Sequence, residues 1–120
     1  MDKVFGRKIK EQRHRLDLSL RKVCETVRNE DGKAISVSYL NDIEQSYRNP
    51  PGGKIIVQLA TVLELDAQEL LNLAGKVDPV IEAAVGRDAK VGMLFRRIAQ
   101  KLEHDPGVVE RLDKQIDKKT

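Results

Sequence analysis

The sequence predicts an all-α protein, and three observations lead to this class. Aromatic residues make up only 3% of the 120 residues while hydrophobic residues make up 40%, so a core must consist mainly of Leu, Ile, Val and Ala. With 34% charged residues, such a composition favours helices. Apolar residues also recur at spacings of three and four, between Ser or Asp at helix starts and Gly or Pro at breaks. We therefore expect packed helices.

Three helices are expected before residue 46. The first spans about residues 2–16 and is amphipathic and basic. Ser19 and Ser36 are placed to cap the second and third helices, because a serine hydroxyl accepts a hydrogen bond from a free amide of the first turn. The apolar residues expected on the buried sides are Val4, Phe5, Ile9, Leu16, Leu20, Val23, Cys24, Val27, Leu40 and Ile43.

A loop is expected over residues 46–53, because two prolines and two glycines there oppose a helix. A fourth helix follows this loop. Asp66, with Glu69 three residues later, predicts a capping box at the start of a fifth helix, which Gly75 should end. The apolar residues of these two helices are Ile55, Ile56, Leu59, Val62, Leu63, Leu70, Leu71 and Leu73.

The five helices described so far are expected to form one domain over residues 1–76. Residues 77–120 are expected to form a separate C-terminal region of two to three short helices. Asp-Pro pairs at 78–79 and 105–106 place a capping acid before a proline at the first helical position, and Asp88 can cap a helix between them. Two apolar stripes folded only on each other would make a marginal hairpin, so we expect a second copy or the fifth helix to cover them. The residues expected to dimerise are Val91, Leu94, Phe95, Ile98, Leu102, Val109, Leu112 and Ile116.

The charge distribution points to the first part of the chain. The net charge of +3 permits binding to a polyanion without requiring it. Lys and Arg outnumber Asp and Glu by 11 to 8 in residues 1–48, whereas residues 49–77 carry 2 against 3 and residues 78–120 carry 9 against 8. The basic excess therefore lies mainly in the part that contains the third helix.

The sequence also argues against several classes of protein. A single cysteine, Cys24, allows no intramolecular disulfide and no zinc-binding thiolate cluster, which fits a reducing cytoplasm. We expect neither a secretory signal nor a membrane span. Because no nucleophile with a base, paired acids or phosphate-binding loop emerges, we expect no enzyme, cofactor or metal.

The third expected helix carries the strongest functional signal. Leu40 and Ile43 point to one side, which leaves small polar side chains on the other. Ser and Asn side chains can bond base edges and phosphates, so this side suits a DNA major groove. The alternative, an ordinary solvated helix surface, is weaker because further segments agree with the DNA interpretation.

In this order the segments resemble the helix-turn-helix family of Cro and phage repressors, often called the XRE family. The resemblance covers about residues 4–75 and rests on LDLSLRKVC (16–24), ISVSYLNDIE (35–44), RNPP (48–51) and LATVLELD (59–66). Members of this family place the second helix of the motif in the major groove and lay the first across the backbone. Two features depart from the family: Cys24 stands where Ala is common, and about six extra residues, 28–33, precede the third helix.

The resemblance implies roles for individual residues. Base contacts are implied for Val37, Ser38, Asn41 and Asp42. Backbone contacts are implied for Ser19, Arg21, Ser36, Tyr39, Gln45 and Arg48, with Lys22 and Arg28 as weaker candidates. Arg13 and Glu44 match a structural ion pair that joins the first helix to the end of the third.

Two questions stay open at this point. The extra residues 28–33 could extend the second helix or widen the turn, with Arg28 and Lys33 contacting phosphate, or they could be a tolerated surface insertion. The expected function is a cytoplasmic DNA-binding regulator, a repressor that binds a palindromic operator on double-stranded DNA as a homodimer. The alternatives are an antitoxin-like module whose C-terminal helices bind an unknown partner protein, and a repressor inactivated when a companion protease cuts those helices.

Overall fold

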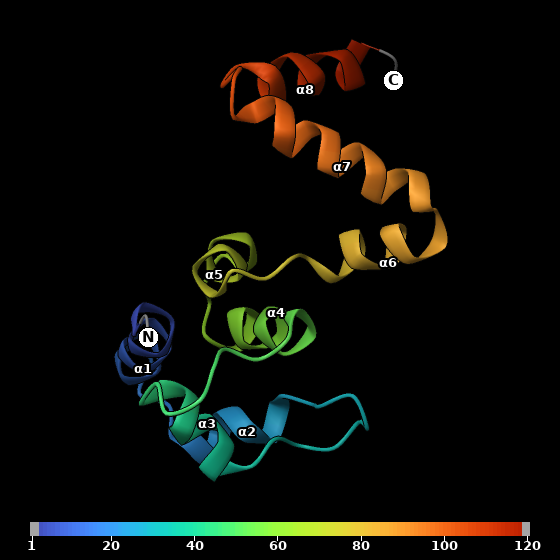
Figure 1. Ribbon diagram of the computed structural model, residues 1–120. Coiled ribbons are helices and arrows are strands. Elements are labelled where there is room, and N and C mark those ends of the chain that lie inside the picture. Colours follow the sequence, from blue (N-terminus) through green and yellow to red (C-terminus); the bar gives the residue numbers. More distant parts are fainter. Residues whose placement is uncertain (1–2, 119–120) are drawn as a thin grey trace. The chain divides into compact units, whose positions relative to one another are not determined.

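The computed structural model describes residues 3–118, and its regular structure is helical throughout that range (Figure 1). This confirms the all-α class. One isolated β-bridge joins Arg28 to Ala34. In chain order the helices are α1 (Val4–Arg15), α2 (Leu20–Thr26), α3 (Val37–Glu44), α4 (Gly53–Val62), α5 (Ala67–Ala74), α6 (Pro79–Arg87), α7 (Ala89–Leu102) and α8 (Val108–Lys118).

The chain divides into two compact units, Met1–Pro79 and Val80–Thr120. The division lies three residues beyond the expected boundary at 76. Residues 77–79 belong to the first unit because they pack closely against the start of α4. A Cβ atom added at Gly53, the first residue of α4, would lie 2.9 Å from the Val77 carbonyl oxygen and 3.2 Å from the Pro79 ring.

The first unit encloses the hydrophobic core. Helix α1 packs on α3 and α5, α2 packs on α3 and α4, and α4 packs on α5. Val23, Leu40 and Leu59 are completely buried, so burial extends through the centre of the unit. The buried core residues are Phe5, Ile9, Val23, Cys24, Val27, Ile35, Leu40, Ile43, Ile56, Leu59, Ala60, Leu63, Leu70 and Leu71. Burial raises the pKa of the Cys24 thiol, with a smaller contribution from the negative charge of Glu44.

Local signals place most helix ends correctly. The side chains of Ser19, Ser36, Asp66 and Asp88 accept backbone amide hydrogen bonds at the starts of α2, α3, α5 and α7, which confirms the predicted caps. Gly75 adopts a left-handed conformation at the end of α5, with φ of 66°. These ends depend on neighbouring residues alone, which is why the sequence predicts them.

Two apolar residues expected on buried stripes are exposed instead. Val4 at the start of α1 is 44% exposed and Leu73 in α5 is 39% exposed. Both line an open groove of about 560 Å³ formed by residues of α1 and of the segment 65–73. Helix α1 also ends at Arg15, one residue before the expected end, and the expected start at residue 2 lies outside the described residues.

The start of α8 differs from the expectation. The helix begins at Val108, two residues after the proline at 106. The Asp105 carboxylate accepts a hydrogen bond from the Gly107 amide at 3.2 Å and pairs with Arg111, so it stabilises a turn before the helix. Glycine is entropically unfavourable within a helix, which also delays its start. The hydrogen bond from Arg111 lowers the pKa of Asp105.

The second unit is thinly packed. Helices α7 and α8 contact each other, and among the described residues of this unit only Val108 is buried. An apolar groove of about 280 Å³ remains open along the two helices. Its lining residues are Leu94, Ile98, Leu112, Gln115 and Ile116.

Candidate nucleic-acid interface

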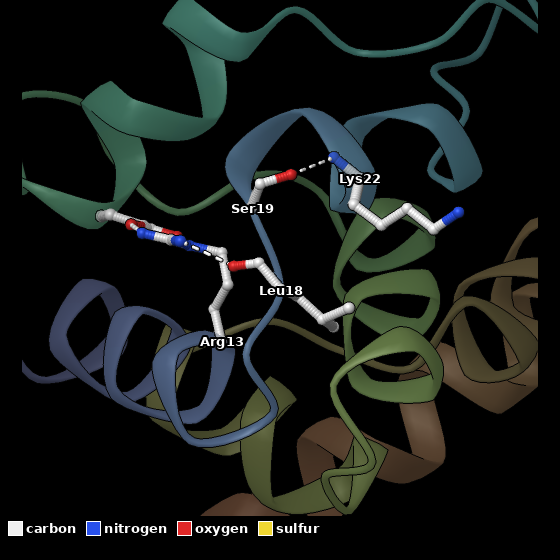
Figure 2. Close-up of polar contacts among 5 residues, drawn as sticks. Arg13, Leu18, Ser19 and Lys22 are labelled. Carbon is white, nitrogen blue, oxygen red and sulfur yellow. Dashed lines mark hydrogen bonds and ion pairs between the residues drawn. The ribbon is translucent and has the colours of Figure 1, made fainter.

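Helices α2 and α3 pack on each other and are joined by residues 27–36, which gives the order helix, turn and helix. Ser19 caps α2 by accepting a hydrogen bond from the Lys22 amide at 3.1 Å (Figure 2). Ser36 caps α3 by accepting from the Tyr39 amide at 3.0 Å. In both caps the hydroxyl oxygen is the acceptor, so each hydroxyl hydrogen is still available to a further acceptor such as a phosphate.

Helix α3 buries one side and leaves the other accessible. Leu40 and Ile43 lie in the core, whereas Val37 is 40% exposed and Ser38 is exposed. The other two expected readers, Asn41 and Asp42, are only half-buried rather than fully outward. Backbone hydrogen bonds close the end of α3: the Gln45 amide donates to the Asn41 carbonyl and the Tyr47 amide donates to the Asp42 carbonyl.

A buried ion pair joins α1 to the end of α3. The Arg13 guanidinium donates from Nε to Oε2 of Glu44 at 2.8 Å and from Nη2 to Oε1 at 2.9 Å, which makes the pair bidentate. Nη1 donates to the Leu18 carbonyl at 2.9 Å, and Figure 2 shows Arg13 directed at that carbonyl. The side chains are 9% and 1% exposed, and the hydrogen bond that Arg13 donates to Glu44 raises the pKa of Arg13. This geometry fixes α3 against α1.

Gly6 lets the two helices meet directly. A Cβ atom added there would lie 2.4 Å from the Ile43 carbonyl oxygen and 2.7 Å from that of Glu44, so only glycine fits without movement. This role of Gly6 is not among the features predicted from the sequence. A single glycine within an amphipathic helix was the available signal, since it lowers helix propensity and needs a packing reason.

Several residues expected to contact the DNA backbone lie close together at α3. The Arg48 guanidinium carbon is 5.1 Å from the centre of the Tyr39 ring, and the Tyr39 amide is bonded to Ser36. Ser36 and Arg48 are exposed, while Tyr39 and Gln45 are half-buried. The remaining two expected residues, Ser19 and Arg21, are exposed at the start of α2.

The extra residues before α3 form a short hairpin. Helix α2 ends at Thr26, so they do not extend it. The Asn29 amide donates to the Lys33 carbonyl at 2.8 Å, and the side chain of Asn29 accepts two further amide bonds within the turn. The Gln58 side chain of α4 is bonded to the first residue of this hairpin, Arg28. It donates to the Arg28 carbonyl at 2.8 Å and accepts from the Arg28 amide at 2.7 Å. Because Arg28 pairs with Ala34, Arg28 and Lys33 fall on opposite faces of the hairpin.

The residues expected to dimerise lie on α7 and α8 and are accessible in the single chain. Leu94, Phe95, Leu102, Val109 and Ile116 are between 44% and 65% exposed. Val91, Ile98 and Leu112 are half-buried. Both helices thus present apolar side chains that intrachain packing does not cover.

Residues 3–118 show neither a cluster of metal ligands nor a membrane-spanning helix. No three His, Cys, Asp or Glu side chains in that range gather as a metal site requires. Within the same range, no helix is long and apolar enough to cross a membrane.

Comparisons with known proteins give little further information. No family model matches the chain, and no curated protein matches it. Among solved structures, a SinR protein/SinI protein complex is similar over 96% of this chain and 97% of the other, with 24% sequence identity and a TM-score of 0.46.

Proposed function

We propose that the chain is a sequence-specific DNA-binding regulator of the helix-turn-helix class, and specifically an XRE-family repressor that acts in the cytoplasm. The observation that carries this proposal is the accessible side of α3, held in one orientation by the buried Arg13–Glu44 pair and the close approach at Gly6. Rigid orientation matters for reading bases, because hydrogen bonds to base edges require precise placement.

Four residues of α3 are the proposed base readers. Asn41 has the amide group that can make two bonds to adenine, and the methyl groups of Val37 suit the methyl group of thymine. Ser38 can donate to or accept from a base edge. Asp42 can accept from the amino group of cytosine, although phosphate repels its charge. Each good paired contact contributes about 1–3 kcal/mol of discrimination at one base position.

The proposed backbone contacts supply affinity that is independent of sequence. They comprise Ser19, Arg21, Ser36, Tyr39, Gln45 and Arg48. Each cation that neutralises a phosphate releases counterions, so the affinity should fall steeply as salt rises. Arg48 is the best placed of the cations, because the Tyr39 ring at 5.1 Å restricts its guanidinium beside α3.

A homodimer is the proposed binding unit, formed through the apolar residues of α7 and α8. A second copy of the same pair of helices would cover residues such as Leu94 and Ile116, which are 51% and 65% exposed in one chain. Two copies of α3 related by a twofold axis would meet palindromic half-sites about one helical turn, roughly 34 Å, apart.

Selection from a random library of DNA duplexes at near-physiological salt tests the proposal. The full chain should enrich a palindrome with half-sites one turn apart. No enrichment, with binding that disappears as salt rises, would contradict it. With the enriched duplex in hand, Asn41→Ala should relax the preference at one base position, whereas Arg48→Ala should weaken binding to all sequences by a similar factor.

A second candidate is an antitoxin-like module that binds a partner protein through its C-terminal helices and regulates its own operon. The open groove along α7 and α8 favours it, because a partner helix could occupy the same apolar side chains as a second copy. The two candidates differ in solution. A full chain that remains monomeric until a partner is added would favour the antitoxin-like module.

A further inference from the structure

Four helices of the first unit end in the same backbone motif, and in three of them the left-handed residue is not glycine. After α1, α3 and α4, one residue that is not glycine adopts a left-handed conformation, and the amide of the next residue donates to a carbonyl of the last turn. This Schellman arrangement satisfies carbonyl groups that the helix leaves free. The left-handed residues are Asp17, Ser46 and Glu64, with φ of 56°, 62° and 55°. The amides that follow are those of Leu18, Tyr47 and Leu65.

The side chains after the left-handed residues behave differently. In this motif the side chain at that position commonly packs on the end of its helix. Leu18 and Leu65 are partly buried and pack against the core, as the motif predicts. Tyr47 is 77% exposed. A single exposed apolar residue is ordinary on a protein surface. At the fourth helix end the equivalent residue is Lys76, which is polar and exposed. Among these four positions, Tyr47 is therefore the one with a large apolar side chain that does not pack against the core.

Tyr47 lies beside the proposed DNA-binding surface. Its amide donates to the Asp42 carbonyl of α3 at 2.9 Å, which fixes its backbone to the proposed reading helix. The next residue, Arg48, lies over the ring of Tyr39. Tyr47 therefore follows the proposed reading helix and precedes Arg48, a proposed phosphate contact. Its backbone is hydrogen-bonded to α3, whereas its side chain is exposed to solvent.

We propose that Tyr47 contacts the DNA backbone, with its hydroxyl donating to a phosphate oxygen and its ring lying against the adjacent sugar. This inference rests on the proposed function and adds a residue to that site. Tyrosine suits the role because it combines a hydroxyl donor with a broad apolar body that loses little entropy when it is ordered. Since the ring is neutral, the contact adds affinity without releasing a counterion.

Tyr47→Leu separates this role from a structural one. Leucine stands at the equivalent positions 18 and 65, so the variant should melt at or above the temperature of the wild type. Its affinity for the duplex that the wild type selects should fall about tenfold, the effect of losing one hydrogen bond to a charged group. The dependence of affinity on salt should keep its slope. Arg48→Ala, as the charged counterpart, should reduce that slope by about one.

Tyrosine fluorescence gives a second, direct measurement. The chain has two tyrosines and no Trp, so in a Tyr39→Phe variant the emission comes from Tyr47 alone. Saturation with the selected duplex should change this emission. Wild-type affinity in Tyr47→Leu would overturn the inference, as would unchanged emission at saturation. If the wild-type chain selects no duplex at all, the proposed function fails instead.

Discussion

The two units of the chain contain similar amphipathic helices but bury them very differently. In the first unit, five helices enclose residues such as Leu40 and Leu59, which are completely buried. In the second unit, among the described residues, only Val108 is buried, and residues such as Ile116 remain 65% exposed. An apolar stripe alone therefore does not indicate whether a helix contributes to a core within its own chain.

This difference in burial indicates whether each unit can fold alone. The first unit has a core, helix caps and a buried ion pair, so it contains the interactions that small domains need to fold. The second unit gains little from burial within one chain, and a helical pair of that size is marginal without further apolar contact. Variants of the first unit can be measured both in the full chain and in a chain that ends at Pro79, the last residue of that unit, whereas variants of the second unit require the full chain.

The largest effect is expected from Arg13→Ala. Removing the guanidinium leaves the Glu44 carboxylate buried without its partner, so unfolding in urea should show a loss of about 4 kcal/mol in both chains. DNA affinity should fall as α3 loses its fixed orientation. The double variant Arg13→Met with Glu44→Leu should recover most of the stability. Unchanged melting and binding in Arg13→Ala would reject the role assigned to the ion pair.

Next in size is a matched pair of leucine truncations. Leu40→Ala creates a cavity in a fully buried site and should lower the free energy of unfolding by about 3 kcal/mol in both chains. Leu94→Ala in the full chain should change the unfolding of the first unit by less than about 0.5 kcal/mol, because half of its side chain is exposed. It should instead weaken self-association. Equal losses from the two variants in the full chain would contradict the contrast between the units.

Gly6→Ala should have an intermediate effect. The added methyl group would collide with backbone oxygens of α3 rather than with a flexible side chain, so the helices must separate. We expect a loss of about 2 kcal/mol by urea unfolding, typical of overpacking in a core. Gly86→Ala is the matched control, since nothing lies within 4 Å of a Cβ atom there. A stable Gly6→Ala variant would mean that α1 and α3 do not meet as closely as described.

The smallest effect is a gain in stability from Ser46→Gly. The left-handed conformation at φ of 62° strains a serine but not a glycine. Because glycine also gains entropy in the unfolded chain, the net stabilisation should be only about 0.5–1 kcal/mol. Thermal melting can detect this change. A lower melting temperature would indicate that the Ser46 side chain makes a compensating interaction.

Local features of the fold were predictable from the residues themselves, whereas close approaches between distant segments were not, apart from the Arg13–Glu44 pair that the family resemblance implied. The caps at Ser19, Ser36 and Asp66 depend on bonds within three residues, so their residue types indicate the helix starts. In contrast, Gly6 packs against the backbone of α3, and the Gln58 side chain is hydrogen-bonded to the Arg28 backbone. Both contacts join residues at least 30 positions apart. No local pattern specifies which segments will meet.

In the candidate site, too, some features could be predicted from the sequence and others could not. The polar side of α3 follows from helical periodicity, and the structure leaves Val37 and Ser38 exposed on it. The partial burial of Asn41 and Asp42 could not be predicted, because helical periodicity does not specify how far neighbouring segments cover a side chain. The departure of Tyr47 from the packing of Leu18 and Leu65 is visible only once the three helix ends are compared in space.

The central claim is that the first unit folds alone and the second unit joins two copies of the chain. Sedimentation equilibrium of the full chain and of the chain ending at Pro79 tests it most directly. We expect a dimer for the full chain, and a folded monomer with cooperative unfolding for the shorter one. A monomeric full chain would contradict the claim, as would a shorter chain that still dimerises or does not fold.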